Sequence, residues 1–220
     1  MELLTGIETR RSLRAFKSTP ITKEVLERIF KAAAKSPSYT NTQPWEIVVI
    51  SGEKKEELSR ILCALVASDV TPNPDIPLPK NWPLELDRRA REHGKRRFQA
   101  IGIEREDERQ RKELRLSNFK FYGAPCVLFL FMDSTLGPWS IFDMGLFAQS
   151  IILAAHSFGI GSCLQAALAS YPDAVREFVG IPGTKQLVLG ISLGYPDLEA
   201  RINTYQSSRV GLDDFVQWYP

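Results

Sequence analysis

The chain has 220 residues, enough for one sizeable hydrophobic core. Its 28 lysines and arginines nearly balance 26 aspartates and glutamates, so the formal charge of +2 gives no strong field for nucleic acid or an anionic membrane. Three widely spaced cysteines and two histidines match no disulfide or zinc pattern. No apolar run has the length of a signal-peptide core or a transmembrane helix, so we expect a cytoplasmic protein without a metal site.

The chain begins with two helical patterns separated by a basic turn. Residues up to Thr9 predict a short helix, and Thr22 is a typical N-cap for a second helix that Pro37 ends. Between them, RRSLR (residues 10–14) places three arginines and a serine within five residues. Such a segment can donate several charge-assisted hydrogen bonds to a phosphate, although a solvated basic turn is the common alternative.

A polar loop from Ser36 to Trp45 joins the second helix to a strand predicted at Glu46–Ser51. The amide side chains of Asn41 and Gln43 offer donors and acceptors together, which suits the polar edge of a heterocycle. The alternative is an ordinary helix-to-strand connection. A further amphipathic helix is predicted at residues 54–67.

The next fifty residues differ from the rest of the chain in composition. They begin with a proline-rich stretch that excludes regular structure, and residues 85–115 then hold 11 lysines and arginines against 8 acidic residues. This mixture predicts exposed helices with many ion pairs rather than a nucleic-acid-binding tail. We predict an insertion at residues 72–115 of a single domain spanning 1–220. It is either a solvated excursion or a lid that places Trp82 and Phe98 over a ligand and leaves cofactor binding nearly untouched.

The C-terminal half carries the main core elements. CVLFLFMD (residues 126–133) is apolar almost throughout and predicts a strand buried on both faces. A long apolar helix is predicted from Trp139 to Phe158, and we expect His156 within it to be packed rather than catalytic. Small residues from Gly159 to Cys163 allow either a close approach to a ligand or a tight strand. A short helix at 174–179 and a strand at 185–194 complete the pattern.

Five segments of the chain occur in the order and approximate spacing that one protein family shows. They are RRSLR, SPSYTNTQPW, GAPCVLFLF, GIGSCLQAAL and ISLGYPD…NTYQSSR. The chain thereby resembles the FMN-dependent nitroreductases, in a branch with a long lid insertion. The resemblance implies an α+β fold with a mixed, mainly antiparallel sheet flanked by helices. It also implies an intertwined homodimer in which the C-terminal tails are exchanged and both chains complete each FMN site.

The resemblance also implies which residues contact FMN. Phosphate and ribityl contacts are expected from Arg10, Arg11, Ser12, Arg14 and Arg209. Contacts to the flavin ring are expected from the partner chain's copies of Pro37, Ser38, Tyr39, Asn41 and Gln43. The segment past flavin N5 corresponds to Ser162, Cys163, Leu164, Gln165, Ala166 and Ala167, and Lys120 takes a looser match near the N1 edge.

The activity implied is ping-pong hydride transfer through flavin N5, from NAD(P)H to a nitroaromatic, quinone or similar electron-poor acceptor. No protein residue is then expected to be catalytic. The arginines of the insertion favour NADPH over NADH. The alternatives are a flavin-binding or flavin-supplying protein without turnover, and a relative of reductive dehalogenases or flavin-destroying enzymes.

Overall fold

The computed structural model describes residues 1–104 and 106–219. Its sheet has four strands in the order β1-β2-β4-β3, and every ladder between them is antiparallel. The strands are β1 (Glu46–Ser51), β2 (Cys126–Asp133), β3 (Gly161–Gln165) and β4 (Lys185–Gly194). The α-helices are α1 (Leu3–Thr9), α2 (Lys23–Ala33), α3 (Gly52–Ala67), α4 (Leu84–Ile101), α5 (Glu108–Phe119), α6 (Pro138–Ser157) and α7 (Pro172–Val179).

Helices cover both faces of the sheet, and the side chains of β2 divide between them. Leu128 and Leu130 pack in one core cluster with α2 and α6, whereas Phe129 and Phe131 pack in the other with α3 and α7. Successive side chains of a strand point to opposite faces, so a strand covered on both sides must be apolar throughout. This explains the uninterrupted apolar run of the sequence.

The predicted α+β fold is confirmed, and the core elements lie close to their expected positions. The hydroxyl of Thr22 accepts a hydrogen bond from Val25 N at 3.4 Å and caps α2. Gly159 follows α6 with a φ of +71°, a left-handed conformation that favours glycine. The parallel component of the mixed sheet is a single bridge between Ser12 and Ser162.

Helix α6 is the central helix, as expected. By length and composition alone it could cross a membrane, and it is the one such helix among the described residues. Its residues Met144, Phe147 and Ile151 are buried in the cluster that it shares with α2 and the sheet. The apolar sequence of α6 is therefore accounted for by packing in the core.

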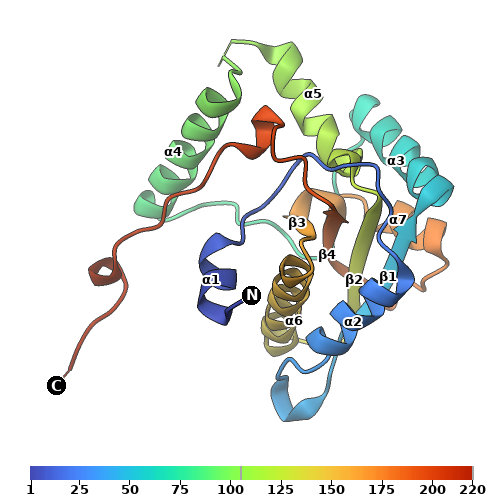
Figure 1. Cartoon of the computed structure of the whole chain (residues 1–220). Coiled ribbons are helices and arrows are strands. Elements are labelled where there is room, and N and C mark those ends of the chain that lie inside the picture. Colours follow the sequence, from blue (N-terminus) through green and yellow to red (C-terminus); the bar gives the residue numbers. More distant parts are fainter. Residues whose placement is uncertain (105, 220) are drawn as a thin grey trace.

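The insertion contains α4 and most of α5; α4 stands apart from the sheet, and α5 leads back toward it (Figure 1). Helix α4 has no buried residue, and its outer cations form ion pairs with acids three or four positions away, as in Arg91–Asp87 and Arg96–Glu92. The C-terminal tail runs along α4, where Tyr205 Oη lies 3.1 Å from His93 Nδ1 and Arg201 Nε donates to Ala100 O.

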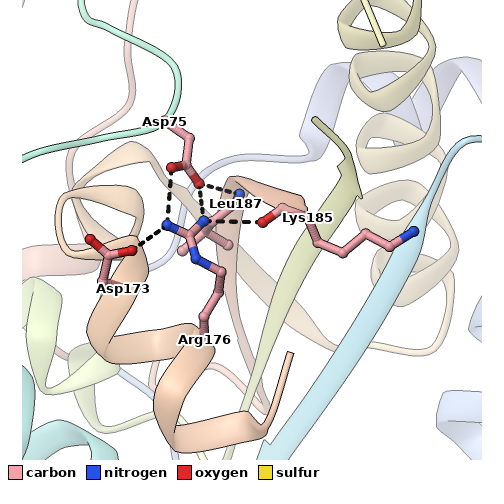
Figure 2. A network of polar contacts seen from close by, with 5 residues as sticks. All are labelled: Asp75, Asp173, Arg176, Lys185 and Leu187. Atoms are coloured by element: carbon pink, nitrogen blue, oxygen red, sulfur yellow. Dashed lines mark hydrogen bonds and ion pairs between the residues drawn. The ribbon is translucent and has the colours of Figure 1, made fainter. Parts of the chain in front are cut away.

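A polar network fixes the proline-rich stretch that leads into α4 (Figure 2). Arg176 of α7 binds Asp75 through two hydrogen bonds of 2.5 and 3.2 Å, and Leu187 N of β4 donates to the same carboxylate at 2.7 Å. Arg176 also donates to Asp173 and to Lys185 O. The first part of the insertion is thereby tied to the core.

Candidate functional site

A cavity of about 1040 Å³ opens where the turn after α1, the end of α6, the start of β3, α4 and the C-terminal tail meet. Six of its lining residues carry or can carry positive charge, and Glu8 is the one acidic residue among the described residues that line it. The cationic and hydroxyl groups are supplied by Thr9, Arg10, Arg11, Ser12, Arg14, His93, His156, Ser162, Tyr205, Ser207 and Arg209. An anionic ligand matches this lining.

Backbone contacts bring the basic turn to the edge of β3. Leu13 N donates to Ser162 O at 2.9 Å, next to the bridge between Ser12 and Ser162. A Cβ atom at Gly161 would lie 2.7 Å from Cδ1 of Leu13, so a larger residue there would force the buried Leu13 side chain to shift. The small residues of the GIGSC segment are therefore used to dock the basic turn.

A second contact ties the turn to the tail. Arg14 N donates to Asn203 Oδ1 at 2.6 Å, and Asn203 Nδ2 donates to Ala15 O at 2.9 Å. Asn203 is buried and precedes the segment that delivers Arg209 to the cavity. Residues 10–14 and 209, nearly two hundred positions apart in the chain, are thus held against one another.

The arginines are close enough to repel one another. Burial, and then the charge of Arg209, hold the pKa of Arg10 below its ordinary value. Among the described residues, no acidic side chain forms an ion pair with Arg10 or Arg209. Their mutual repulsion is relieved when an anion such as a phosphate binds between them.

Both histidines of the chain line this cavity, a role that the sequence did not reveal. His156 Nε2 lies 2.9 Å from Thr9 Oγ1, and His93 comes from α4. Burial first, and then neighbouring arginines, lower the pKa of each imidazole. His93 belongs to the predicted insertion, which the sequence analysis expected to leave cofactor binding nearly untouched; this residue is exposed, and it lines the cavity where the tail packs against α4.

Only the first residue of the expected flavin-facing segment lines the cavity. Cys163 and Gln165 are buried, Leu164 and Ala167 are half-buried, and Ala166 is exposed. The Gln165 side chain accepts a hydrogen bond from Ser192 Oγ at 2.5 Å and donates to Asn118 O at 3.0 Å. The side chain of Gln165 therefore serves the core, whereas the backbone of the segment forms strand β3.

Lys120 is not brought to this cavity. It is exposed and lines a neighbouring cavity of about 590 Å³ together with Lys55 and Tyr122. Arg14 lines both cavities and lies between them.

The polar loop expected to contact the flavin ring lies elsewhere in the same chain. Tyr39 N donates to the buried carboxylate of Asp143 at 3.1 and 3.2 Å, and the Tyr39 ring stacks on Trp139. Asp143 precedes His156 by thirteen positions on α6, a separation of about 20 Å along the helix axis. Pro37, Ser38, Tyr39, Asn41 and Gln43 are therefore absent from the lining of the cavity.

The backbone of this loop is strained. Thr40, Asn41 and Gln43 all have positive φ values, between +48° and +58°. Such conformations are uncommon for residues other than glycine, and they are costly for a β-branched residue such as Thr40. Thr40, Asn41 and Gln43 are all exposed, so the strained turn presents its amide side chains outward.

The two aromatic residues expected on the lid do not line the cavity either. Trp82 is exposed ahead of α4. The ring of Phe98 is half-buried and lies 5.1 Å from the guanidinium carbon of Arg111. Contact of the insertion with the cavity is made by His93.

Comparisons with known proteins agree on one family. The model of the nitroreductase family matches residues 7–195. The 4-nitrobenzoate reductase of Pseudomonas putida is 34% identical, over 99% of this chain and 98% of its own. The crystal structure of the FMN-dependent nitroreductase NfnB from Mycobacterium smegmatis in complex with NADPH superposes with a TM-score of 0.95 at 32% identity, over 99% of this chain and 97% of that chain. The crystal structure of the FMN and NADPH-dependent nitroreductase NfnB from Sphigopyxis sp. strain HMH superposes with a TM-score of 0.97 at 31% identity, over the full length of both chains.

Proposed function

The chain belongs to the nitroreductase family, and we propose that it is an FMN-dependent oxidoreductase that uses NAD(P)H to reduce nitroaromatic, quinone or similar electron-poor acceptors. The observation that carries the proposal is the cavity lined by Arg10, Arg14 and Arg209, in which these cations have no acidic partner among the described residues. A phosphate-bearing flavin fits this set of donors. The arginines of the insertion favour NADPH as the donor.

Different residues of the cavity bind different parts of FMN. Arg10 and Arg209 bind the phosphate of FMN between them, and Ser12 adds a hydroxyl donor. Arg14 contributes a cation further along the cavity, on the side that continues toward Tyr122. When bound, FMN supplies hydride transfer at its N5 atom, so the protein binds and orients the reactants and provides no catalytic acid or base. The nicotinamide and the acceptor use the same space in turn.

Retention of FMN tests the phosphate assignment. Arg10→Ala and Arg209→Ala should each raise the Kd for FMN about 10- to 100-fold, because charge-assisted hydrogen bonds of this kind contribute about 1.5–3 kcal/mol. The Kd for riboflavin, which lacks the phosphate, should change less than about threefold. Full flavin occupancy with an unchanged Kd in both variants would contradict the assignment.

The visible spectrum tests turnover. The purified protein should be yellow, and NADPH added without oxygen should bleach the flavin band, which a nitroaromatic then restores. A yellow protein that NADPH does not bleach would instead be a flavin carrier. This single measurement therefore distinguishes an enzyme from a flavin carrier.

The position of the polar loop supports a homodimer. Its ring-contact residues lie about 20 Å along α6 from the cavity, so the copy that completes a flavin site comes from a second chain. Exposed apolar side chains at Trp139, Phe142, Phe215 and Trp218 provide surface for that contact. The free thiols of the three cysteines suit the reducing cytoplasm in which we place the enzyme.

Deleting residues 210–220 tests the dimer while keeping Arg209. The truncated protein should sediment as a monomer and lose FMN. A monomeric full-length protein with one FMN per chain would exclude shared sites.

A further inference from the structure

The two ends of the polar loop are fixed on helix α6. Ser36 at its start is buried, and its Oγ atom lies 2.7 Å from Ser150 Oγ. Trp45 at its end stacks on Phe147, with 4.4 Å between the ring centroids and 5° between the ring planes. Phe147 and Ser150 are three positions apart on the helix, so both contacts come from one face of α6. Both ends of the loop therefore rest on one side of the core helix.

Asp143 adds a third contact on the same face, four positions before Phe147. Its carboxylate accepts a hydrogen bond from Tyr39 N, with N–O distances of 3.1 and 3.2 Å. Asp143 is only 2% exposed, and among the described residues this N–H is its one side-chain donor and no cation pairs with it. Burial of a carboxylate with a single donor is costly, and an apolar residue of similar size would pack there at least as well. Packing of the core therefore does not explain Asp143.

The turn that Asp143 holds is strained. The next residues along the loop include Thr40, Asn41 and Gln43, whose φ values lie between +48° and +58°. A hydrogen bond of 3.0 Å from Gln43 N to Ser38 Oγ supports this shape. The exposed side chain of Asn41 has no hydrogen-bond partner among the described residues. Strained backbone persists only where its surroundings enforce it, and here it directs amide side chains away from their own chain.

We propose that Asp143 is a positioning residue: by accepting the Tyr39 N–H it holds the strained turn in the conformation that a flavin bound by a second chain requires. The proposal rests on the proposed function, because it assigns the residue that shapes the ring-contact side of the same flavin site. Asp143 itself touches neither the flavin nor a substrate. Its effect is therefore on binding of the flavin ring, which FMN and riboflavin share, and not on binding of the phosphate.

Removal of the hydrogen-bond acceptor tests this assignment. Asp143→Leu has no acceptor for the Tyr39 N–H and should raise the Kd for FMN and the Kd for riboflavin alike, each by about tenfold. Asp143→Asn keeps a carbonyl oxygen and should restore most of the affinity. The Tm of the Asp143→Leu apoprotein should be no lower than that of the wild type, because the buried carboxylate is gone. Glu177→Leu removes an exposed carboxylate from α7, on the other face of the sheet, and is the matched control that should alter neither Kd.

Mixed dimers show on which chain's flavin Asp143 acts. The first mixed dimer pairs an Arg209→Ala chain with an Asp143→Leu chain. One of its sites then combines both defects and the other has neither, so it should bind one FMN per dimer with the wild-type Kd. The second pairs a chain carrying both substitutions with a wild-type chain. Each of its sites then has one defect, and neither should reach the wild-type Kd.

Several results would overturn the positioning role. These are unchanged Kd values in Asp143→Leu, equal losses in Asp143→Leu and Asp143→Asn, a loss of FMN that a fall in apoprotein Tm accompanies, or the reverse pattern in the two mixed dimers. A wild type that shows the expected binding but whose flavin NADPH does not bleach would refute the proposed activity and leave the role of Asp143 standing. The two failures are therefore distinguishable.

Discussion

Strand β2 and helix α4 differ sharply in how they are held. The first seven residues of β2 are buried, whereas α4 has no buried residue and rests on the tail through polar contacts such as His93–Tyr205. Burial of β2 stabilises the fold through apolar area and close packing, which tolerate little movement. The contacts of α4 can be exchanged for contacts with water or a ligand at small cost. The sheet therefore provides the scaffold, whereas α4 contributes His93 to the cavity wall and is held by polar contacts.

The largest effect should come from the scaffold. Phe129 is fully buried, and Phe129→Ala should lower the free energy of unfolding by about 3–5 kcal/mol through lost burial and the cavity left behind. Urea denaturation of the two proteins measures the difference. Leu84→Ala at the exposed start of α4 is the control, with an expected change within about 0.5 kcal/mol. Similar losses in both variants would contradict the division between the regions.

The second-largest loss of stability is expected at the contact that ties the insertion to the core. Arg176→Ala would leave the half-buried carboxylate of Asp75 without its charged partner and should cost about 1.5–3 kcal/mol. Hydrogen exchange should also rise in the proline-rich stretch around Asp75. Asp173→Asn, at a side chain that is 79% exposed, should cost less than about 1 kcal/mol. Unchanged exchange in Arg176→Ala would show that the network does not anchor the insertion.

Replacing α4 with a Gly-Ser linker should separate stability from ligand binding. We expect the free energy of unfolding to fall by less than about 1 kcal/mol, because no residue of α4 is buried. The Kd for FMN should rise about tenfold because His93 is lost from the cavity, and acceptor preference should shift by at least as much. A linker variant with native FMN affinity and native acceptor preference would show that α4 takes no part in binding either ligand.

The smallest effect concerns pH. Burial and neighbouring arginines hold the pKa of His93 and His156 below the ordinary value of about 6.5. Below that pH the unfolded chain binds more protons than the folded apoprotein, so the apoprotein should lose a few degrees in Tm as the pH falls from about 7.5 to about 6. The double variant His93→Gln, His156→Gln should lose less over the same interval. An equal fall in Tm for the wild type and the double variant would show that other groups cause the pH dependence.

Local chemistry in the sequence determined the core elements. An uninterrupted apolar run specified β2, a threonine at an N-cap specified the start of α2, and a glycine specified the end of α6. These features depend on hydrogen bonds and burial within a few residues, so their positions could be predicted closely. The motif RRSLR likewise placed three arginines within five residues, and the structure brings all three into the lining of the cavity.

Only the tertiary structure decided which distant side chains share a site. Packing of the tail against α4 placed His93 and Arg209 in the lining of one cavity, and docking of residues 10–14 on β3 added Arg10 and Arg14 to it. The same packing directed Lys120 to another cavity and left the loop of Asn41 at the far end of α6. Neither outcome is encoded in a local pattern, because each depends on contacts between residues about a hundred or more positions apart, such as Tyr39 and Asp143. The sequence therefore determined the elements and, through its resemblance to a family, the expected cofactor, whereas the fold decided which charged side chains line one cavity.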